Sequence, residues 1–283
     1  MRKRIAGLVS LFLMCGYSAL AQDTGSVAES NFPATGYLQF PPHFQPRRAN
    51  TVEKVNAAPP PLPSYEQPPL PQAGYLWVPG FWAWRNPIPD YYWVPGTWVQ
   101  PPREGLLWTP PYWSRVDGGY VFHAGYWAEQ VGFYGGIDYG YGYTGDGYQG
   151  GRWENGVFSY NRAVNNLGSL VIAGVYDQAV AAGTKEVRVS FNGGSGGTTA
   201  RPTASQQALA DARHIEATAE QQKHFELAAM DRALYSRLNH GEPGVAATQH
   251  AGVLEGSGVT RSSELVNDTA QPGDRLTTGA STK

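Results

Sequence analysis

The sequence predicts a mixed, β-rich fold, in which an antiparallel meander of short aromatic repeat strands precedes a small C-terminal helical segment. Three observations carry this prediction. Related aromatic octets recur in the first half of the chain, a Tyr/Gly-rich run with an Asn-Gly pair follows them, and two capped helix patterns come later. The proline-rich N-terminal region and the Gly/Ser/Thr-rich C-terminal region are expected to be disordered.

Residues 1–21 have the three parts of a secretory signal peptide: basic residues near the start, an apolar stretch and an Ala-Leu-Ala cleavage motif. We therefore expect cleavage between Ala21 and Gln22. Export would place the protein in the periplasm, at the outer membrane surface or outside the cell. The apolar stretch is shorter than the roughly 20 residues of a membrane-spanning helix. No later stretch meets that requirement, so no transmembrane segment is expected in the mature chain.

Cys15, the only cysteine, offers an alternative, which is lipid attachment as in bacterial lipoproteins. Met14 precedes it, where such sites have a small residue, so cleavage after Ala21 is favoured. The mature chain would then form no disulfide. It would carry 18 basic and 23 acidic side chains, a net charge of −5, spread along the chain. Nucleic-acid binding requires a clustered basic face, so we expect no nucleic-acid partner.

Composition divides the mature chain into five regions. Residues 22–73 read as a proline-rich disordered linker, and residues 74–162 as an aromatic repeat and Tyr/Gly-rich β module that holds all nine tryptophans. Residues 163–202 are expected to be an extended linker, residues 203–241 a helical pair, and residues 242–283 a disordered tail.

The proline-rich region favours extended polyproline II structure, which acts as a semi-rigid spacer. Pro60 and Pro63 also fit the PxxP pattern of polyproline ligands. A cytosolic partner of that kind is implausible for an exported protein, so a spacer is the favoured interpretation.

Four octets, YLWVPGFW, YYWVPGTW, LLWTPPYW and YVFHAGYW, define the aromatic repeats within residues 75–127. Each octet with its loop suits a strand followed by a reversal. Residues five apart in a regular strand face opposite sides of a sheet. A bulge with positive φ at Gly80 and Gly96 would bring both tryptophans of an octet to one face. The third octet has Pro111 at this position, so its bulge must differ or be absent.

Two interpretations of the repeat tryptophans remain open. They form the core of a module that is poor in Leu, Ile and Val, or they form exposed platforms that stack on sugar rings. The candidate structural or ligand-contact residues are Trp77, Trp82, Trp93, Trp98, Trp108, Trp113, Trp127, Trp153, Gly80 and Gly96.

Residues 132–151 alternate tyrosine with glycine over part of their length. They fit either a strand that shows its tyrosines on one face or a flexible low-complexity loop. The next feature is clearer, because Asn155-Gly156 is a favoured type I′ turn pair. It predicts a hairpin in which Trp153 lies opposite Phe158.

Two T-x-x-Q patterns, at Thr203–Gln206 and Thr218–Gln221, predict helices that begin with capping boxes. The second helix is expected to end at Gly241. Its apolar stripe is expected to pack on the parent fold, and His224 to lie in solvent. The stripe consists of Leu227, Met230, Leu234 and Leu238.

The sequence context argues against each candidate catalytic or metal-binding motif. Residues 193–197 match the nucleophile elbow G-x-S-x-G, but they lie in a flexible glycine run without the helix that the elbow needs. The six histidines include no HExxH pair and have no cysteine near them, so no zinc site is expected. We therefore expect no enzyme activity, catalytic residue, metal or cofactor.

The octets, the Tyr/Gly run and GRWENGVFSYN at residues 151–161 resemble the YXWGXW or WXXGXW repeat proteins of Gram-negative bacteria, some of which are termed BcpO-related. The resemblance covers residue 74 to about residue 166, with departures in the third and fourth octets. Residues 188–203 and the helix after them resemble a C-terminal part often attached to such repeats. The resemblance implies an exported envelope protein without established enzymatic activity.

These observations predict a non-catalytic exported envelope protein whose aromatic module is a structural or protein-interaction scaffold, accessory to a secretion or contact-dependent system. The alternative is a glycan- or peptidoglycan-binding module with exposed Trp and Tyr platforms. The partner is accordingly an envelope protein or a glycan, whose identity the residues do not reveal.

Overall fold

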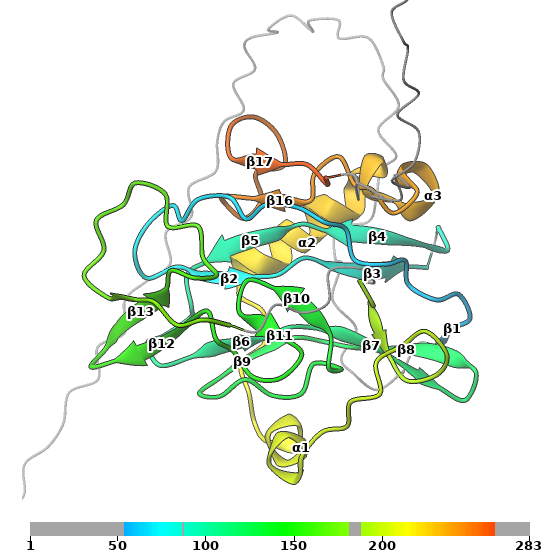
Figure 1. Ribbon diagram of the computed structural model, residues 1–283. Helices are drawn as coiled ribbons and strands as arrows, with labels where there is room; N and C mark the ends of the chain where they lie inside the picture. Colours follow the sequence, from blue (N-terminus) through cyan, green and yellow to red (C-terminus); the bar gives the residue numbers. More distant parts are fainter. Residues whose placement is uncertain (1–53, 87, 181–187, 264–283) are drawn as a thin grey trace, which may run out of the picture. The chain divides into compact units, whose positions relative to one another are not determined.

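The computed structural model describes residues 54–86, 88–180 and 188–263 (Figure 1). The predicted signal peptide, Cys15 and the last part of the tail lie outside these residues. The described part is β-rich with antiparallel strand pairs, and its helices are short and lie towards the C-terminus, so the predicted fold class is confirmed.

Each octet forms two short strands, with a break at its Pro-Gly or equivalent pair. In the first two octets, β2 pairs antiparallel with β5, and β3 pairs antiparallel with β4. The two octets therefore make one long hairpin that is interrupted in the middle (Figure 1). Its strands are β2 (Leu76–Val78), β3 (Phe81–Arg85), β4 (Asp90–Val94) and β5 (Gly96–Val99).

The third and fourth octets repeat this arrangement. Here β6 pairs with β9, and β7 pairs with β8 across a tight turn at Asp117-Gly118, where both residues have positive φ. The structural unit is thus a hairpin of two octets, and the chain contains two such units in succession. The strands of the second hairpin are β6 (Leu107–Thr109), β7 (Tyr112–Val116), β8 (Gly119–His123) and β9 (Tyr126–Ala128).

Cross-strand pairing brings the tryptophans of partner octets together. In the first hairpin, Trp77 lies opposite Trp98 and Trp82 lies opposite Trp93. The ring centroids of these pairs are 5.3 and 5.2 Å apart in edge-to-face geometry, which aromatic pairs prefer. In the second hairpin the matching pairs are Trp108 with Trp127 and Trp113 with Phe122.

The glycines of the breaks serve close packing, and the expectation of positive φ at Gly80 and Gly96 is wrong. A Cβ added to Gly80 would lie 2.3 Å from Cζ2 of Trp93, and one added to Gly96 would lie 2.7 Å from Cζ2 of Trp77. Each glycine is therefore needed because the edge of an indole ring occupies the space of a side chain.

The second hairpin explains why Pro111 stands where Gly80 stands in the first. Gly125 has the same place in the second hairpin as Gly96 has in the first. Glycine is needed there too, because a Cβ at Gly125 would lie 2.4 Å from Cζ2 of Trp108. The aromatic residue opposite the third octet is Phe122, which lacks the second ring of an indole. The indole atom of Trp93 that fills the space over Gly80 therefore has no counterpart in Phe122.

Three parallel strand pairs extend the predicted meander. Strand β14 (Val175–Tyr176) pairs with β13 (Val157–Asn161), β15 (Phe191–Asn192) with β7, and β16 (Ala247–Thr248) with β5. Strand β1 (Lys54–Val55) adds to β8, and β17 (Val259–Thr260) adds to β16. All three regions predicted as linker or tail therefore contribute strands, and Ala247 and Thr248 in the tail are fully buried.

The Tyr/Gly run packs its tyrosines inward. It forms β10 (Asp138–Gly140) and β11 (Tyr143–Thr144), with an irregular register between them. The hydroxyl of Tyr139 donates to the carbonyl of Pro111 at 2.6 Å, and that of Tyr143 donates to the carbonyl of Trp108 at 2.9 Å. Both carbonyls lie beside the break in the third octet, so the run satisfies backbone groups that the break leaves unpaired.

The hairpin predicted at Asn155-Gly156 is confirmed. It joins β12 (Gly151–Glu154) to β13 (Val157–Asn161), with φ of 51° at Asn155 and 79° at Gly156. Trp153 lies opposite Phe158, as predicted, with their ring centroids 5.3 Å apart.

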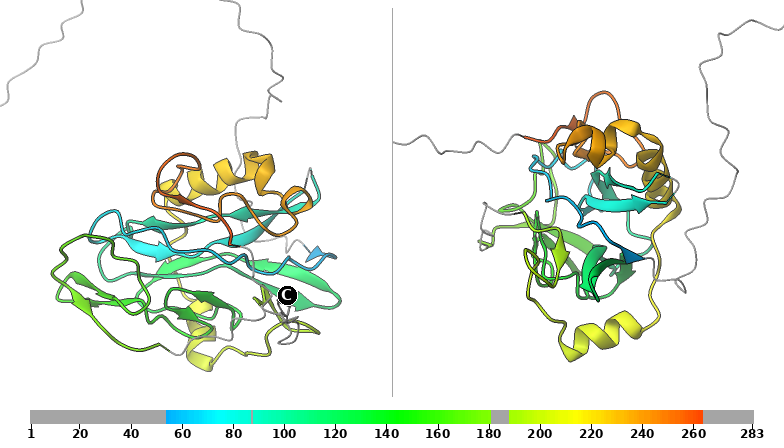
Figure 2. Two further views of the ribbon diagram at one scale, coloured as in Figure 1. Left: turned by 45° about the horizontal axis from the view of Figure 1, so that its top comes forward. Right: turned by 90° about the vertical axis from the view of Figure 1, so that its right-hand side faces the viewer.

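Both predicted capping boxes are confirmed, at the starts of α1 (Ala204–Asp211) and α2 (Ala219–Met230). The predicted end of the second helix is wrong, because α2 stops at Met230. It is followed by η1 (Arg232–Leu234) and α3 (Ser236–Asn239). Helix α2 packs on the first hairpin, whereas α1 has no buried residue and stands off the body of the protein (Figures 1 and 2).

The predicted packing of the apolar stripe is confirmed at Leu234, which is fully buried, and is wrong at two other positions. Met230 and Leu238 are 56% and 55% exposed, and α2 ends at Met230, before its face reaches Leu238. The buried face of α2 instead carries Gln221, His224, Ala228 and Ala229.

His224 is fully buried, contrary to the expectation of a solvated position. Its Nδ1 accepts a hydrogen bond from the N–H of Gly252 at 2.9 Å, so Nε2 carries the hydrogen and donates to the carbonyl of Pro95 at 2.9 Å. Burial lowers the pKa of His224 to about 4. The neutral imidazole thus joins α2 to the break of the second octet and to the C-terminal segment.

Candidate functional site: an aromatic groove filled by a proline-rich segment

Residues 57–70, which we term the strap, pack along the first hairpin and carry most of the prolines of the predicted spacer. Leu62, Tyr65 and Leu70 are buried in the same core as the repeat tryptophans. The spacer interpretation of residues 22–73 is therefore wrong for the part that the structure describes, from residue 54 onwards. The surface that the strap covers is termed the groove below.

Seven buried residues hold the strap against the groove. Four of them, Pro59, Leu62, Tyr65 and Pro68, are spaced by three residues, which is the period of polyproline II, and the other three are Pro63, Gln67 and Leu70. Pro61, Glu66 and Pro69 are exposed. Proline-rich segments favour polyproline II, which makes no internal hydrogen bonds, so the carbonyls of the strap are open to outside donors.

Aromatic side chains of the first hairpin supply several of these donors. Trp82 Nε1 donates to the carbonyl of Pro61 at 3.0 Å, and Trp98 Nε1 donates to that of Pro68 at 2.9 Å. The hydroxyl of Tyr91 donates to the carbonyl of Ala57 at 2.8 Å. Trp82 and Trp98 thus serve both as core rings and as hydrogen-bond donors to the strap.

The segment around β15 lies along the first half of the strap. Arg188 Nη1 donates to the carbonyl of Pro63 at 2.7 Å, and the carbonyl of Arg188 accepts from the N–H of Leu62 at 2.9 Å. Ser190 Oγ donates to the carbonyl of Pro59 at 3.1 Å. Residues predicted to be linker therefore form one wall of the groove.

Asn166 holds the second half of the strap through three groups. Its N–H donates to Oε1 of Gln67 at 2.7 Å, and its Nδ2 donates to the carbonyl of Gln67 at 3.0 Å. Its carbonyl accepts from the N–H of Leu70 at 2.8 Å. Gln67 is buried, so the hydrogen bond from Asn166 to its side chain takes the place of water.

Tyr65 enters the deepest part of the groove. Its ring lies 6.4 Å from Trp77, 6.3 Å from Trp93 and 5.7 Å from Tyr141, measured between centroids. Its hydroxyl accepts from the N–H of Gly80 at 3.4 Å, and its carbonyl accepts from the hydroxyl of Tyr141. Burial raises the pKa of Tyr65 well above its usual value.

Seven of the eight candidate tryptophans are no more than 3% exposed, and their ring faces are covered by other side chains. Trp153 is the exception. It is half-buried, and its Nε1 donates to the carbonyl of Leu106 at 2.9 Å. Stacking on a sugar requires an open ring face, which the other seven residues do not offer. Those seven are Trp77, Trp82, Trp93, Trp98, Trp108, Trp113 and Trp127.

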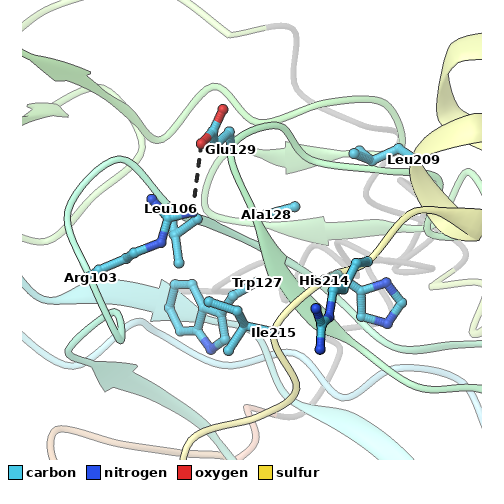
Figure 3. Close-up of a pocket in the computed structure, with 9 residues that line it drawn as sticks. Arg103, Leu106, Trp127, Ala128, Glu129, Leu209, His214 and Ile215 are labelled. Atoms are coloured by element: carbon cyan, nitrogen blue, oxygen red, sulfur yellow. Dashed lines mark ion pairs between the residues drawn. The ribbon is translucent and has the colours of Figure 1, made fainter.

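A shallow depression of about 230 Å³ lies beside β9 and the segment after α1 (Figure 3). Trp127 and Ile215 line it, and Arg103 and Glu129 form an exposed ion pair at 3.6 Å on its rim. His214 stacks on Tyr126 with centroids 4.3 Å apart. Small-molecule sites typically exceed about 300 Å³ and bury most of their ligand, so this depression is the weaker candidate.

Chemistry-bearing side chains in the described ranges stay dispersed. Ser114 Oγ lies 2.7 Å from Nε2 of His123, whose pKa burial lowers, but no carboxylate of the described residues hydrogen-bonds to that imidazole. The G-x-S-x-G match follows β15 and leads into turns, with α1 beginning only at Ala204. Within the described residues, no three His, Cys, Asp or Glu side chains gather where they could hold a metal.

The WXXGXW repeat family matches the chain in two copies, at residues 73–99 and 105–128. Each copy coincides with one of the two-octet hairpins. Residues 73–99 and 105–128 are therefore two WXXGXW repeats, in agreement with the resemblance found in the sequence. Neither the curated proteins nor the solved structures contain a match to it. None of the helices in the described ranges is both long and apolar enough to cross a membrane.

Sequence reasoning found the tryptophans but missed the strap, Arg188 and Asn166. One signal was present, because Pro59, Leu62, Tyr65 and Pro68 follow the three-residue period of polyproline II. For Arg188 and Asn166 the residue types alone carry no comparable signal.

Proposed function

We propose that this protein is a non-catalytic, exported envelope protein whose WXXGXW hairpins act as a structural and protein-interaction scaffold. The observation that carries the proposal is the burial of the seven repeat tryptophans. Pairs of large rings packed edge to face give a small β module a rigid core despite its shortage of aliphatic residues. The partner is an envelope protein, and the setting is accessory to a secretion or contact-dependent system.

Burial argues against the glycan-binding alternative. A platform for sugar rings needs several coplanar exposed aromatic faces, whereas the seven repeat tryptophans are buried, and four of them donate their N–H groups to the chain's own backbone carbonyls. The arrangement fits a scaffold, in which the aromatic repeats determine shape.

Export is proposed from the features of residues 1–21, with a mature chain that begins at Gln22 and carries no lipid. The intact mass of the protein purified from the cell envelope tests this part. A diacylated species that begins at Cys15 would refute it and would place the protein on a membrane leaflet.

Paired measurements on Trp82→Ala and Trp98→Ala test the scaffold itself. Each truncation should lower the free energy of unfolding by about 3–5 kcal/mol, through lost transfer energy and an unfilled cavity. Trp153→Ala, at a half-buried position, is the matched control and should cost less. Retention on peptidoglycan and exopolysaccharide is measured in parallel. Unchanged melting with lost glycan retention in both variants would overturn the scaffold in favour of a lectin-like role.

A further inference from the structure

We infer that the groove is a receptor for polyproline II segments, and that the strap is its resident ligand. The ligand class is a proline-rich segment of a partner protein with Pro, Leu, Tyr and Pro at three-residue spacing, the pattern of Pro59, Leu62, Tyr65 and Pro68. The inference rests on the proposed scaffold function and gives it a partner chemistry.

The contacts between strap and groove are those of ligand recognition. Strands in a sheet are joined by a continuous ladder of backbone hydrogen bonds. The strap is instead held mainly by side-chain donors that reach its carbonyls, among them the indoles of Trp82 and Trp98 and the guanidinium of Arg188. Aromatic-lined grooves recognise polyproline II helices in this way, because such a helix is preformed and leaves its carbonyls unpaired.

Selectivity comes from the buried positions of the repeat. The Tyr65 pocket is closed by Trp77, Trp93 and Tyr141, and it presents the N–H of Gly80 to the hydroxyl. A side chain without a hydroxyl would leave that donor unpaired, and a small side chain would leave a cavity. The groove is therefore selective for a segment with a tyrosine between prolines, and a segment that is only rich in proline should bind more weakly.

The chain before the strap is held by β1, which pairs with β8, but two features of the strap itself favour exchange. An open cavity of about 180 Å³ remains beside Pro59 and Pro61, so this end of the groove has room for a larger side chain. At the other end, Gln72 and Ala73 are exposed, and Gly74 turns the chain with φ of 91°. The connection to β2 can therefore be opened without disturbing a buried residue.

The test uses the full-length protein with a protease recognition site inserted between Gln72 and Ala73. After cleavage, a fluorescent peptide of residues 57–72 is added in excess. Anisotropy and gel filtration measure its binding, and mass spectrometry measures release of the original fragment. We expect saturable exchange. A peptide of the same composition in scrambled order, and one with Leu62→Ser and Tyr65→Ser, should not enter.

Two matched groove variants make the test specific. Trp98→Phe removes the donor to Pro68 and should weaken peptide binding roughly five- to tenfold, the fold-change that corresponds to about 1–1.4 kcal/mol for one hydrogen bond. Trp153→Phe also removes an indole donor, but its partner is Leu106 outside the groove, so the affinity should not change.

A second measurement on the uncleaved chain keeps the inference testable if the cleaved protein does not fold. The uncleaved chain with Leu62→Ser and Tyr65→Ser in its own strap should melt at a lower temperature, and the peptide should restore part of the loss. Absence of exchange together with absence of this rescue, or equal binding of the scrambled peptide, would overturn the inference. Neither result bears on export or glycan retention, so failure here is distinct from failure of the scaffold proposal.

Discussion

Replacing Gly80 with alanine tests the packing rule that the two hairpins share. The new Cβ would lie 2.3 Å from Cζ2 of Trp93 and 2.8 Å from the backbone nitrogen of Gly96. Ordinary contacts of this kind exceed about 3.4 Å, so one of the neighbours must move by roughly 1 Å in a close-packed core. Overpacking of this kind costs about 1–3 kcal/mol.

The second hairpin supplies the compensating change. There Pro111 and Phe122 replace the pair formed by Gly80 and Trp93, so Trp93→Phe should remove the clash with the ring but not the contact with the backbone nitrogen of Gly96. Trp93→Phe alone is itself destabilising, because it loses ring volume and the hydrogen bond from Nε1 to the carbonyl of Ala246 at 2.9 Å. In the double variant, the part of the Gly80→Ala cost that comes from the ring of Trp93 should disappear. The interaction energy should therefore favour the double variant and stay below the cost of Gly80→Ala alone, which is about 1–3 kcal/mol.

The assay is a double-mutant cycle of chemical and thermal unfolding with four proteins: wild type, the two single variants and the double variant. For a domain of this size, each kcal/mol corresponds to about 2–4 °C in Tm. Gly244→Ala is the control, because that glycine has no positive φ and a Cβ there meets nothing within 4 Å. A Gly80→Ala protein as stable as this control would refute the reasoning, as would additive costs in the cycle.

Three further predictions concern the turn, the helix caps and the buried histidine. Gly156→Val should cost about 1–3 kcal/mol, because φ at this position is 79°, and an unchanged Tm would contradict the turn assignment. Thr218→Ala should cost about 0.5–2 kcal/mol of stability, because it removes the cap of α2. Thr203→Ala should leave the global Tm unchanged, because α1 has no buried residue. Equal losses in the two variants would contradict the different packing of the two helices. The pKa of His224 is about 4 in the folded protein against 6.5 unfolded, so only the unfolded chain takes up this proton between those values. The free energy of unfolding should therefore fall by roughly 3 kcal/mol as pH drops from about 6.5 to 4, and a pH titration of stability in which His224→Gln shows the same slope would contradict this.

The features predicted correctly all depend on residues close in the chain. Asn155-Gly156 sets its own turn and thereby the pairing of Trp153 with Phe158. The capping box at Thr218 closes within a single helical turn. In each case the deciding hydrogen bonds and dihedral angles lie within a few residues, so the local sequence contains the information.

The features missed or wrongly predicted depend on distant partners. His224 has polar neighbours in sequence but is buried because α2 packs against the carbonyl of Pro95. Gly80 was interpreted through its own backbone freedom, whereas the indole of Trp93 across the hairpin makes glycine necessary. Neither effect can be read from a short window of sequence.

The sequence by itself determined the β-rich class, the aromatic repeats, the Asn-Gly hairpin and the helix caps, because periodicity, turn chemistry and capping act locally. Only the tertiary structure decided that octets pair into hairpins, that the repeat tryptophans are buried and that the strap fills a groove. Polyproline II makes no internal hydrogen bonds, so the sequence of the strap is equally compatible with a free spacer and a bound ligand. The donors that distinguish these two states, such as Trp82, Trp98 and Arg188, reach the strap only when the whole chain has folded.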